Sequence, residues 1–461
     1  MTDPRSLSLW FDALGEPADI PSGGLAPRSS IDGDAQADVV VVGAGLTGLW
    51  TAYYLLEADP SLEVVVIEQA TAGFGASGRD GGWCSARFPI SAQGLARQHG
   101  LEAALAMRAA MRDAVVEVGG VAAAEEIDCD FAYGGTVSVA RTAPQLARLT
   151  ADAAGSAQWG DEVHLLDASA VAEHVVVDGV IGGTWTPDCA QLQPLRLVRG
   201  LVDVVTARGA RLVEHTRALR LSPRAVVTDQ GTVRARSVVR ATGAWTSQLP
   251  GSRRQVAAVD RRMIATEPLP PSFWTEVGLA HGQTFSDARL QAGHGRRTSD
   301  DRIVFGGRLT YRRGSALGLG LDDDPRTTEH LRAALADLFP GAANARITHA
   351  WGSPLAIPRD RYPAVGYDED TQTAWAGGYV DDGVAMSNLA GRTIADLVTG
   401  SNSPLVHLPW VGHRSPSWEP EPLRWAGITA GLRGVALADL EERLTGRPSR
   451  VARALSPLLA H

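Results

Sequence analysis

The chain has 461 residues, of which 44% are hydrophobic and 21% charged, and its net charge is -9 at pH 7. This length is enough for a large core shared among several lobes, and the composition is that of a globular protein and excludes a disordered one. The acidic balance, with a pI near 5.7, argues against a general nucleic-acid-binding surface, so we expect no nucleic-acid partner.

The cysteines and the N-terminus favour a cytoplasmic protein. The three cysteines, Cys84, Cys129 and Cys189, are odd in number and form no CxxC pair. This usage fits a reducing compartment and argues against a disulfide framework. The N-terminus carries acids at Asp3 and Asp12 and has no basic-then-apolar pattern, so we expect no signal peptide.

The first informative segment covers residues 37–68 and reads ADVVVVGAGLTGLWTAYYLLEADPSLEVVVIE. An apolar strand at 39–42 runs into GAGLTG at 43–48, a helix follows to about Glu57, and a second strand at 64–67 ends on Glu68. A GxGxxG alone is weak evidence. Between a strand and a helix, with an acid twenty residues after its last glycine, it predicts a dinucleotide site.

Each residue of this motif has a physical role. Gly43 allows the tight turn, Gly45 lets the backbone approach a pyrophosphate, and Gly48 lets the helix lie close to the strand. The helix N-terminus offers free N–H groups to the phosphates. Glu68 accepts hydrogen bonds from ribose hydroxyls, and because its charge repels a 2′-phosphate, we do not expect NADP.

The uncharged run at 39–56 reaches the length of a short membrane span. Its three glycines, the acid that follows and the second strand favour a buried βα unit instead. We therefore expect no stable insertion into a membrane.

A glycine-rich loop at 71–83 follows the second strand directly. Five glycines and a serine in thirteen residues indicate backbone exposed at close range. Arg79 adds a fixed positive charge that reaches a pyrophosphate or an anionic flavin.

The rest of the chain alternates between helical and β-like segments. We expect helices at 99–118, 195–207, 327–339 and 385–398, and a helical C-terminus from about 422 with a break at 446–448. We expect strands at 131–140, 211–214 and 226–228, an apolar strand ending in ATG at 241–243, and short β runs across 255–311. The glycines at 377–383, placed between a strand and a helix N-terminus, predict a second anion site.

This order of elements predicts an α/β chain, α+β overall. In it a Rossmann-type nucleotide-binding domain, built from several separated segments, is interleaved with a mostly antiparallel β-sheet substrate domain. We expect an N-terminal extension at 1–35, nucleotide-binding segments at 36–90, 181–254 and 346–405, substrate-domain segments at 91–180 and 255–345, and a C-terminal helical extension at 406–461.

The chain resembles the FAD-dependent oxidoreductases of the D-amino-acid oxidase and glycine oxidase superfamily, and most of all the branch that includes gamma-glutamylputrescine oxidase. The matching motifs, in order, are GAGLTG at 43–48, GASGRDGGW at 75–83, PDCAQLQP at 187–194, ATGAW at 241–245, FGGR at 305–308, WGSPLAIPRDRYPAVG at 351–366 and GGYVDDGV at 377–384. The resemblance implies bound FAD and hydride transfer from an amine-bearing carbon to flavin N5. It further implies imine hydrolysis to an aldehyde or ketone, and reoxidation of the flavin by O2, giving H2O2, or by another acceptor.

The resemblance also implies which residues bind FAD. They are Gly43, Ala44, Gly45, Thr47, Gly48, Glu68, Gln69, Gly75, Ala76, Ser77, Arg79, Gly81, Gly82, Trp83, Ala218, Thr242, Gly243, Gly378, Asp382, Gly383 and Val384. Ala218 is placed by the local pattern at 211–218.

Two departures from the family pattern bear on the substrate. The branch usually has a glycine where this chain has Asp381, an acid that shifts flavin contacts or faces the substrate amine. The amino-acid oxidases carry an arginine before the proline of the 351–366 motif, where this chain has Ser353. Because an α-carboxylate would lose its bidentate partner there, we expect an amine, primary or secondary, and not a simple α-amino acid.

Aromatic and basic residues are candidates for the substrate pocket. Hydride loss needs a neutral amine, which a dry aromatic pocket favours by lowering the amine pKa. Trp351, Tyr311 and Tyr379 are candidates for lining this pocket, although each is equally well explained as an ordinary core aromatic. Arg308, in a matched motif, is the candidate for holding an anionic tail of the substrate.

Other readings are weighed against this one. An amino-acid, N-methyl amino-acid or aminophosphonate oxidase or dehydrogenase would use Arg308 in place of the missing arginine. A flavoprotein acting on RNA is disfavoured by the charge, and a membrane-surface dehydrogenase would use 447–461 as an interfacial helix, although a packed terminal helix is the more common case. The histidines lack metal-ligand spacing, so we expect no metal. We expect the FAD to be non-covalent; a covalent link at Cys84 is the minor alternative.

Overall fold

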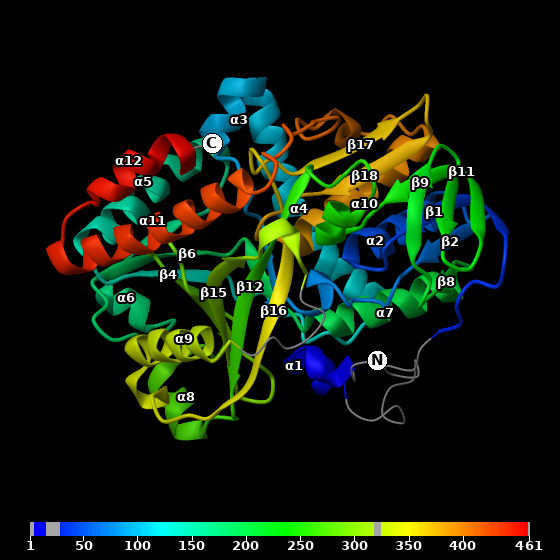
Figure 1. The fold of residues 1–461 in the computed structure, drawn as a ribbon. Helices are drawn as coiled ribbons and strands as arrows, with labels where there is room; N and C mark the ends of the chain where they lie inside the picture. Colours follow the sequence, from blue (N-terminus) through cyan, green and yellow to red (C-terminus); the bar gives the residue numbers. More distant parts are fainter. Residues whose placement is uncertain (1–3, 15–27, 318–323, 460–461) are drawn as a thin grey trace.

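The computed structural model describes residues 4–14, 28–317 and 324–459, with side chains up to Leu455. Two large sheets lie side by side, each with helices packed on it (Figure 1). The first is largely parallel and the second largely antiparallel. This arrangement is the predicted fold class, which is therefore confirmed.

The parallel sheet is assembled from three separated parts of the chain. Its order is β17-β18-β11-β1-β2-β8, and a β9–β10 hairpin pairs with β11. Neighbours from β18 to β8 run parallel, whereas β17 pairs antiparallel with β18 at the edge. The strands are β1 (Ala35–Val42), β2 (Val64–Ile67), β8 (Arg211–Val213), β9 (Ala218–Ser222), β10 (Ala225–Thr228), β11 (Thr232–Arg240), β17 (Ala364–Asp368) and β18 (Thr373–Gly377).

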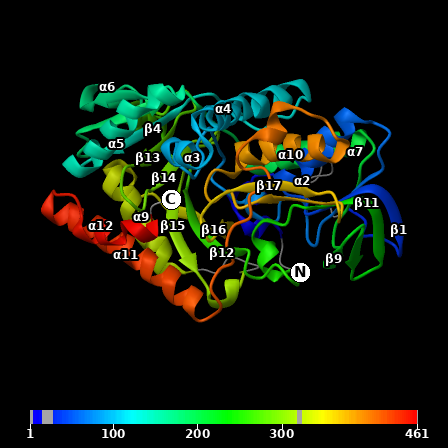
Figure 2. The same ribbon diagram turned by 90° about the horizontal axis from the view of Figure 1, so that it is seen from above.

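Both faces of this sheet are buried, which explains the run of valines in β1. Val39 and Val41 pack into the core beneath the helices, whereas Val40 and Val42 point to the opposite face, toward the β9–β10 hairpin. The helix face is covered by α2 (Leu46–Ala58), α4 (Leu101–Ala124), α7 (Pro194–Ala207) and α10 (Gly383–Thr399) (Figures 1 and 2).

The antiparallel sheet has the order β16-β12-β15-β14-β13-β4-β6-β5, with one parallel pair, β13 and β4. Its three longest strands, β12 (Val256–Thr266), β15 (Ile303–Tyr311) and the edge strand β16 (Ile347–Pro358), reach toward the parallel sheet (Figure 1). The others are β4 (Thr136–Ala140), β5 (His164–Asp167), β6 (Gly182–Thr186), β13 (Thr284–Asp287) and β14 (His294–Arg297), while β3 (Trp83–Ser85) and β7 (Cys189–Gln191) form a separate pair.

The remaining helices cover the ends and the outside. At the N-terminus α1 (Leu9–Asp12) is buried through Leu9, Trp10 and Phe11. At the C-terminus α11 (Leu423–Thr445) passes in front of the antiparallel sheet and contacts β15, and α12 (Arg450–Leu459) folds back on α11 (Figures 1 and 2). The others are α3 (Ala92–His99), α5 (Ala143–Ser156), α6 (Ala168–Ala172), α8 (Pro271–Val277) and α9 (Pro325–Leu338).

The expected helices and strands are present with small shifts in their ends. The strand expected at 131–140 begins only at Thr136, because Gly134 and Gly135 make a close turn before it. The four strands β5, β6, β13 and β14 were not predicted as separate elements. The predicted N-terminal extension falls partly outside the described residues, as do the last residues of the predicted C-terminal helical extension.

Candidate active site

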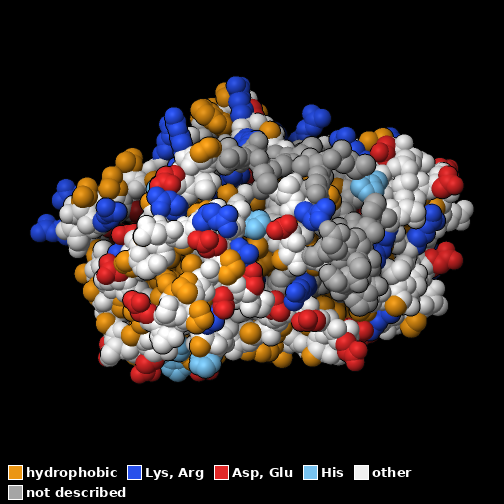
Figure 3. Space-filling model, turned by 90° about the horizontal axis from the view of Figure 1, so that it is seen from below, with side chains coloured by type: hydrophobic (Ala, Val, Ile, Leu, Met, Phe, Trp, Pro, Cys, Tyr) orange, Lys and Arg blue, Asp and Glu red, His pale blue; other side chains and the backbone are white. Residues whose placement is uncertain are grey.

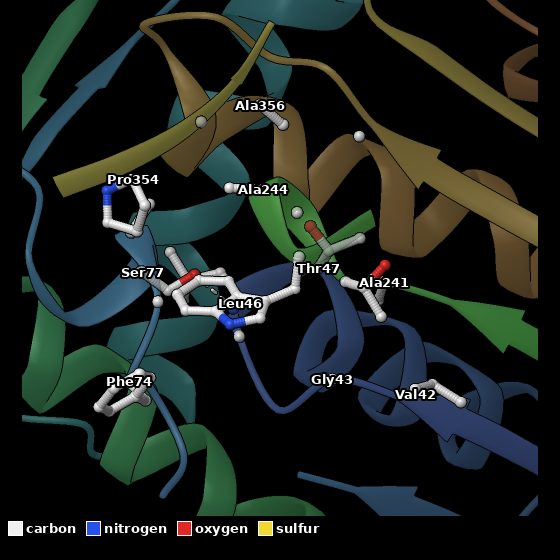
Figure 4. A pocket seen from close by; sticks show the side chains of 18 of the residues that line it. Val42, Gly43, Leu46, Thr47, Phe74, Ser77, Ala241, Ala244, Pro354 and Ala356 are labelled. Carbon is white, nitrogen blue, oxygen red and sulfur yellow. Dashed lines mark hydrogen bonds between the residues drawn. The ribbon is translucent and has the colours of Figure 1, made fainter. Parts of the chain in front are cut away.

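A cavity of about 310 Å³ opens at the carboxyl ends of β1, β2 and β11. This is the edge at which parallel α/β sheets bind ligands. Pro354 and Ala356 of β16 lie across the cavity from Leu46, Thr47 and Ser77 (Figure 4). The cavity thus lies between the two sheets.

The glycines of GAGLTG bring three backbones together. Gly43 adopts a φ of +110°, and a Cβ there would lie 2.5 Å from the carbonyl oxygen of Ala241. A Cβ on Gly48 would lie 1.9 Å from the Gly43 oxygen, so only glycine lets α2 approach β1 this closely. Close packing thus accounts for the glycines at positions 43 and 48. Gly45, whose predicted role is to let the backbone approach a pyrophosphate, lines the cavity.

The Glu68 carboxylate organises the far end of the cavity. One of its oxygens accepts a hydrogen bond from Ala44 N at 3.0 Å and the other from Ala70 N at 2.9 Å. Burial nevertheless raises the pKa of Glu68 to about 7. A donor that entered the cavity, such as a ribose hydroxyl, would favour the ionised form of this carboxylate.

Two helix N-termini face the cavity. Leu46 N, in the first turn of α2, donates to Ser77 Oγ at 3.0 Å, and the Thr47 and Tyr379 hydroxyls are 3.0 Å apart. Asp382 caps α10 by position but makes no side-chain capping bond; its carboxylate accepts from Ser85 Oγ at 2.6 Å instead. The first N–H groups of α10 therefore remain available to an anionic ligand.

The loop that precedes α10 is backbone-strained. Gly378 has a φ of +78° and Val380, a β-branched residue, a φ of +62°. Such a φ is unfavourable for valine and persists only where the surroundings enforce it. Val380 is buried, and both residues line the cavity, so the strain is located at the ligand site.

The glycine-rich loop is fixed by two tryptophans. Trp351 Nε1 donates to the Arg79 carbonyl at 2.6 Å, and Trp10 Nε1 donates to the Asp80 carbonyl at 2.7 Å. The two rings meet edge to face with their centroids 6.2 Å apart. Arg79 itself lies buried with its guanidinium 5.0 Å from the Phe74 ring centre, and burial lowers its pKa to about 10.

A charged cluster lies where the antiparallel sheet meets this loop. Arg261 of β12 forms ion pairs with Asp80, at 3.7 Å, and with Asp381. Burial raises the pKa of the Asp80 carboxyl. Arg261 is also the cross-strand neighbour of Ser353. His294, whose ring centre lies 5.1 Å from that of Trp83 with the two planes tilted, is kept neutral because burial and the positive charge of Arg261 lower its pKa.

Several buried polar atoms in this region have no hydrogen-bond partner among the described residues. They are Arg79 Nη2, Asp80 Oδ1, Arg261 Nε and Ser353 Oγ. Buried polar atoms of this kind normally find partners. Cavity-lining Gly243 and Gly377 also have no atom within 4 Å of an added Cβ. Open space beside glycines and unsatisfied donors and acceptors fit a polar, dinucleotide-sized group such as FAD.

The cavity collects most of the predicted cofactor residues. Those that line it are Gly43, Gly45, Thr47, Glu68, Gln69, Gly75, Ala76, Ser77, Ala218, Thr242, Gly243, Gly378, Gly383 and Val384. Ala44, Gly48 and Asp382 support this lining from behind. Gly81, Gly82 and Trp83 are not among the described lining residues and lie against Met263, His294 and Leu192, while Arg79 lies beside Phe74 behind the lining.

The candidate substrate residues are not all brought together. Tyr379 and Asp381 line the cavity, but Trp351, Arg308 and Tyr311 are not among the described residues that do. The Tyr311 hydroxyl donates to Glu421 at 2.7 Å, and its ring packs with Ala257 and Val259. Trp351 holds the Arg79 carbonyl and packs against Trp10, so the geometry indicates positioning and not contact with substrate.

The sequence did not single out Asp80, Arg261 or the β16 residues Pro354, Leu355 and Ala356 for this site. Asp80 stood inside a quoted motif, and its position after Arg79 was the available signal. The role of Arg261 depends on strand register, which one sequence does not reveal.

The burial of the three cysteines bears on the alternative of a covalent flavin link. All three cysteines are free and buried. Burial raises the pKa of the Cys84 thiol, which opposes the thiolate that a covalent flavin link would need.

Across residues 4–14, 28–317 and 324–459, no cluster of His, Cys, Asp and Glu is arranged to hold a metal ion, and no helix is long and apolar enough to cross a membrane.

Comparisons with known proteins agree with this geometry. Residues 38–397 match the sequence model of a family described as FAD dependent oxidoreductase (DAO). The chain is 28% identical over 402 residues to gamma-glutamylputrescine oxidoreductase of Escherichia coli (strain K12), covering 85% of this chain and 91% of that protein. It is 24% identical over 376 residues to glycine oxidase of Geobacillus kaustophilus (strain HTA426), covering 78% and 92%.

Solved structures share the fold. The crystal structure of glycine oxidase from Geobacillus kaustophilus superimposes with a TM-score of 0.68 at 21% identity, covering 82% of this chain and 99% of that one. L-proline dehydrogenase from P. horikoshii gives a TM-score of 0.66 at 19% identity, covering 82% and 97%.

Proposed function

The chain belongs to the family of FAD-dependent oxidoreductases, with FAD as its cofactor and carbon–nitrogen bonds as its target, and we propose that its substrate is an amine without an α-carboxylate. The single observation that carries this proposal is the state of Arg261. Arg261 is the cross-strand neighbour of Ser353, the position at which amino-acid oxidases of the family have a carboxylate-binding arginine. The guanidinium of Arg261, however, is already paired with Asp80 and Asp381.

The charges around Arg261 favour a cationic or neutral amine over a carboxylate. Two carboxylates pair with one guanidinium, and a third, Asp382, stands next to Asp381 in the chain and accepts from Ser85. When Asp80 and Asp381 are both ionised, one negative charge remains that Arg261 does not neutralise. A substrate carboxylate would add a further negative charge beside the buried Arg261 and Asp80, whereas an ammonium would offset the negative charge.

Asp80 is the proposed acceptor for the substrate nitrogen. Its Oδ1 is buried and has no hydrogen-bond partner among the described residues, and Asp80 lines the cavity. A substrate N–H group would supply the missing donor. Because burial raises the pKa of the Asp80 carboxyl, this group is suited to take a proton from an entering ammonium and leave the neutral amine that oxidation requires.

The cofactor is proposed to lie along the cavity with its ADP part near Glu68. Glu68 would accept from ribose hydroxyls, and the N-termini of α2 and α10 would face the anionic groups. When bound, FAD supplies the two-electron acceptor for the C–H bond next to the nitrogen. Tyr379, whose pKa burial raises, stays protonated and fixes Thr47 at the α2 N-terminus through its hydroxyl.

The relatives support an amine and also give the second candidate. The name of one, gamma-glutamylputrescine oxidoreductase, points to an amine substrate, while the name of glycine oxidase points to an amino acid. An amino-acid oxidase would need a free cation for the carboxylate. Arg308, predicted for that role, lies opposite Arg262 in the register of β12 and β15 and is not among the described cavity-lining residues. This position disfavours an amino-acid oxidase.

Further features of the function are proposed with the substrate. The flavin is reoxidised by O2, giving H2O2, or by another acceptor. The protein works in the cytoplasm, as its three free cysteines suggest. It binds no nucleic acid. The nucleotide-binding segments at 36–90, 181–254 and 346–405 hold FAD, the segments at 91–180 and 255–345 form the substrate domain, and 1–35 and 406–461 are terminal extensions.

Anaerobic reduction of the bound flavin tests the substrate class. The oxidised flavin band is followed by visible absorbance as the holoenzyme is mixed with primary amines, N-methyl amines, γ-glutamyl amines and α-amino acids. We expect bleaching by one of the amine classes and none by glycine, sarcosine or other α-amino acids. Bleaching by α-amino acids alone would refute the reading of Arg261 and Ser353.

A further inference from the structure

The outward face of α11 is an apolar strip. Seven positions spaced alternately by three and four residues are all exposed, and six of them are apolar or small: Leu423, Ala426, Ala430, Leu437, Leu440 and Leu444, with Arg433 as the seventh. Leu437, Leu440 and Leu444 are 57%, 48% and 75% exposed. This spacing places side chains in one row along a helix, so we call these seven residues the α11 strip.

The acids of α11 are used to hold the helix to the body. Asp439 accepts from the backbone N–H groups of Leu290 and Gln291, at 2.7 and 2.9 Å. Glu442 is buried and pairs with Arg148 at 2.9 Å. Glu441 accepts from the first turn of α12. None of the three therefore contributes an exposed negative charge beside the strip.

The exposed charges beside the strip are arginines. From residue 422 to 455 the exposed charged side chains are all arginines, among them Arg433, Arg443, Arg447 and Arg450. This is unusual for a chain with a net charge of -9. The helix lies on the outer edge of the molecule (Figure 2). Along the corresponding upper left rim of Figure 3, hydrophobic and basic side chains stand out, while acidic and basic ones intersperse elsewhere on that face.

We propose that the α11 strip and its arginines dock the protein reversibly on a membrane surface rich in anionic lipids. An apolar row of leucines with arginines at its side is what an interfacial helix presents to lipid, and the 23 residues give a contact about 35 Å long. The arginine stems reach along the apolar surface while their charges meet lipid phosphates. The helix lies on the membrane and does not cross it.

A second copy of this chain is the competing occupant, because the spacing also suits a coiled coil. Pairing the same face of two copies would bring the arginines of both onto one interface and Arg433 into the strip itself. The like charges oppose such a contact, whereas an anionic lipid surface offsets them.

Vesicle co-sedimentation of the holoenzyme tests the proposal. Vesicles of phosphatidylcholine alone are compared with vesicles of equal parts phosphatidylcholine and phosphatidylglycerol. We expect binding to the anionic vesicles that is weakened by salt. The double variant Arg443→Glu/Arg447→Glu should bind at least about twentyfold more weakly, and Leu437→Ser/Leu440→Ser about tenfold or more.

Two matched controls separate the strip from general surface effects. Leu165→Ser removes a leucine that is 53% exposed on β5, and Arg220→Glu reverses an exposed charge on β9; both should bind vesicles as the wild type does. Flavin absorbance and thermal unfolding verify that each variant is folded. The proposal is overturned if the wild type binds neither vesicle, if the strip variants bind as well as the wild type, or if sedimentation equilibrium shows a dimer that Leu437→Ser/Leu440→Ser dissociates.

Discussion

Replacement of Glu68 by glutamine should change how FAD binding depends on pH. In the structure the Glu68 carboxylate accepts from Ala44 N and Ala70 N, at 3.0 and 2.9 Å, and burial raises its pKa from 4.5 to about 7. Hydrogen bonds from ribose hydroxyls are charge-assisted, and therefore strongest, when this carboxylate is ionised. Below its pKa the carboxyl must therefore lose a proton before it holds the cofactor in this way.

The magnitude follows from the pKa of Glu68. One unit below a pKa of about 7, releasing the proton costs about 1.4 kcal/mol, so the dissociation constant of FAD should be about tenfold higher near pH 6 than near pH 8. Glu68→Gln removes the charge-assisted bond, worth about 1.5–3 kcal/mol. Its FAD affinity near pH 8 should fall by roughly 10- to 150-fold and should no longer vary over this range.

The raised pKa of Glu68 also makes the stability of the apoprotein depend on pH. Between its unfolded value of 4.5 and its folded value of about 7, the folded chain holds a proton that the unfolded chain has released. The contribution of Glu68 to the free energy of unfolding is therefore favourable to the folded state only when the carboxyl is protonated, and it falls as pH rises through this window.

The assay is quenching of FAD fluorescence on titration into apoprotein, repeated across this pH range for the wild type and Glu68→Gln. Glu63→Gln, at an exposed carboxylate before β2, serves as the control and should bind FAD like the wild type. A wild-type affinity that does not change with pH, or a glutamine variant with the same pH slope, would show that Glu68 is ionised throughout or does not contact the cofactor.

Three further substitutions, together with one control, test the packing and the charged cluster. Gly48→Ala places a Cβ 1.9 Å from the Gly43 oxygen and should lower the free energy of unfolding by at least about 1–3 kcal/mol, measured in urea, whereas Gly427→Ala, in open space on α11, should raise it by about 0.5–1 kcal/mol. Asp80→Asn should lower kcat/KM for the amine about tenfold or more, with the loss largest at low pH where the substrate is an ammonium; an unchanged pH profile would exclude the proposed proton acceptor. Trp10→Phe keeps a ring but removes the donor to the Asp80 carbonyl, so it should cost about 1–3 kcal/mol of stability and shift the same pH profile; a stability loss with no shift would make Trp10 merely structural.

The sequence was sufficient for those parts of the site that depend on neighbours in the chain. The βαβ unit at 37–68 could be predicted because its glycines, its helix and Glu68 act within one supersecondary motif, where spacing fixes geometry. The α10 N-terminus could be predicted for the same reason, since GGYVDDGV directly precedes the helix. Here local pattern and tertiary structure agree.

The substrate side could not be predicted in this way because it depends on strand register. Arg261 lies opposite Ser353 only through the pairing of β12 with β16, and no residue near either position in the sequence indicates that pairing. Tyr311 was a reasonable candidate as an aromatic in the substrate part. Along β15, however, alternate residues point to opposite faces, and Tyr311 packs with Val259 and reaches Glu421, a residue of the C-terminal segment.

The position of Asp80 depends on parts of the chain that lie far from it in sequence. The two successive carbonyls of Arg79 and Asp80 accept from Trp351 and Trp10, which come from a strand of the other sheet and from the N-terminal helix. Arg261 fixes the side chain from a third direction. Because a misplacement of about 1 Å can cost a large factor in rate, these distant contacts set the precision of the site. The N-terminal helix therefore helps to fix the backbone at Asp80, although no motif within it indicates this contact.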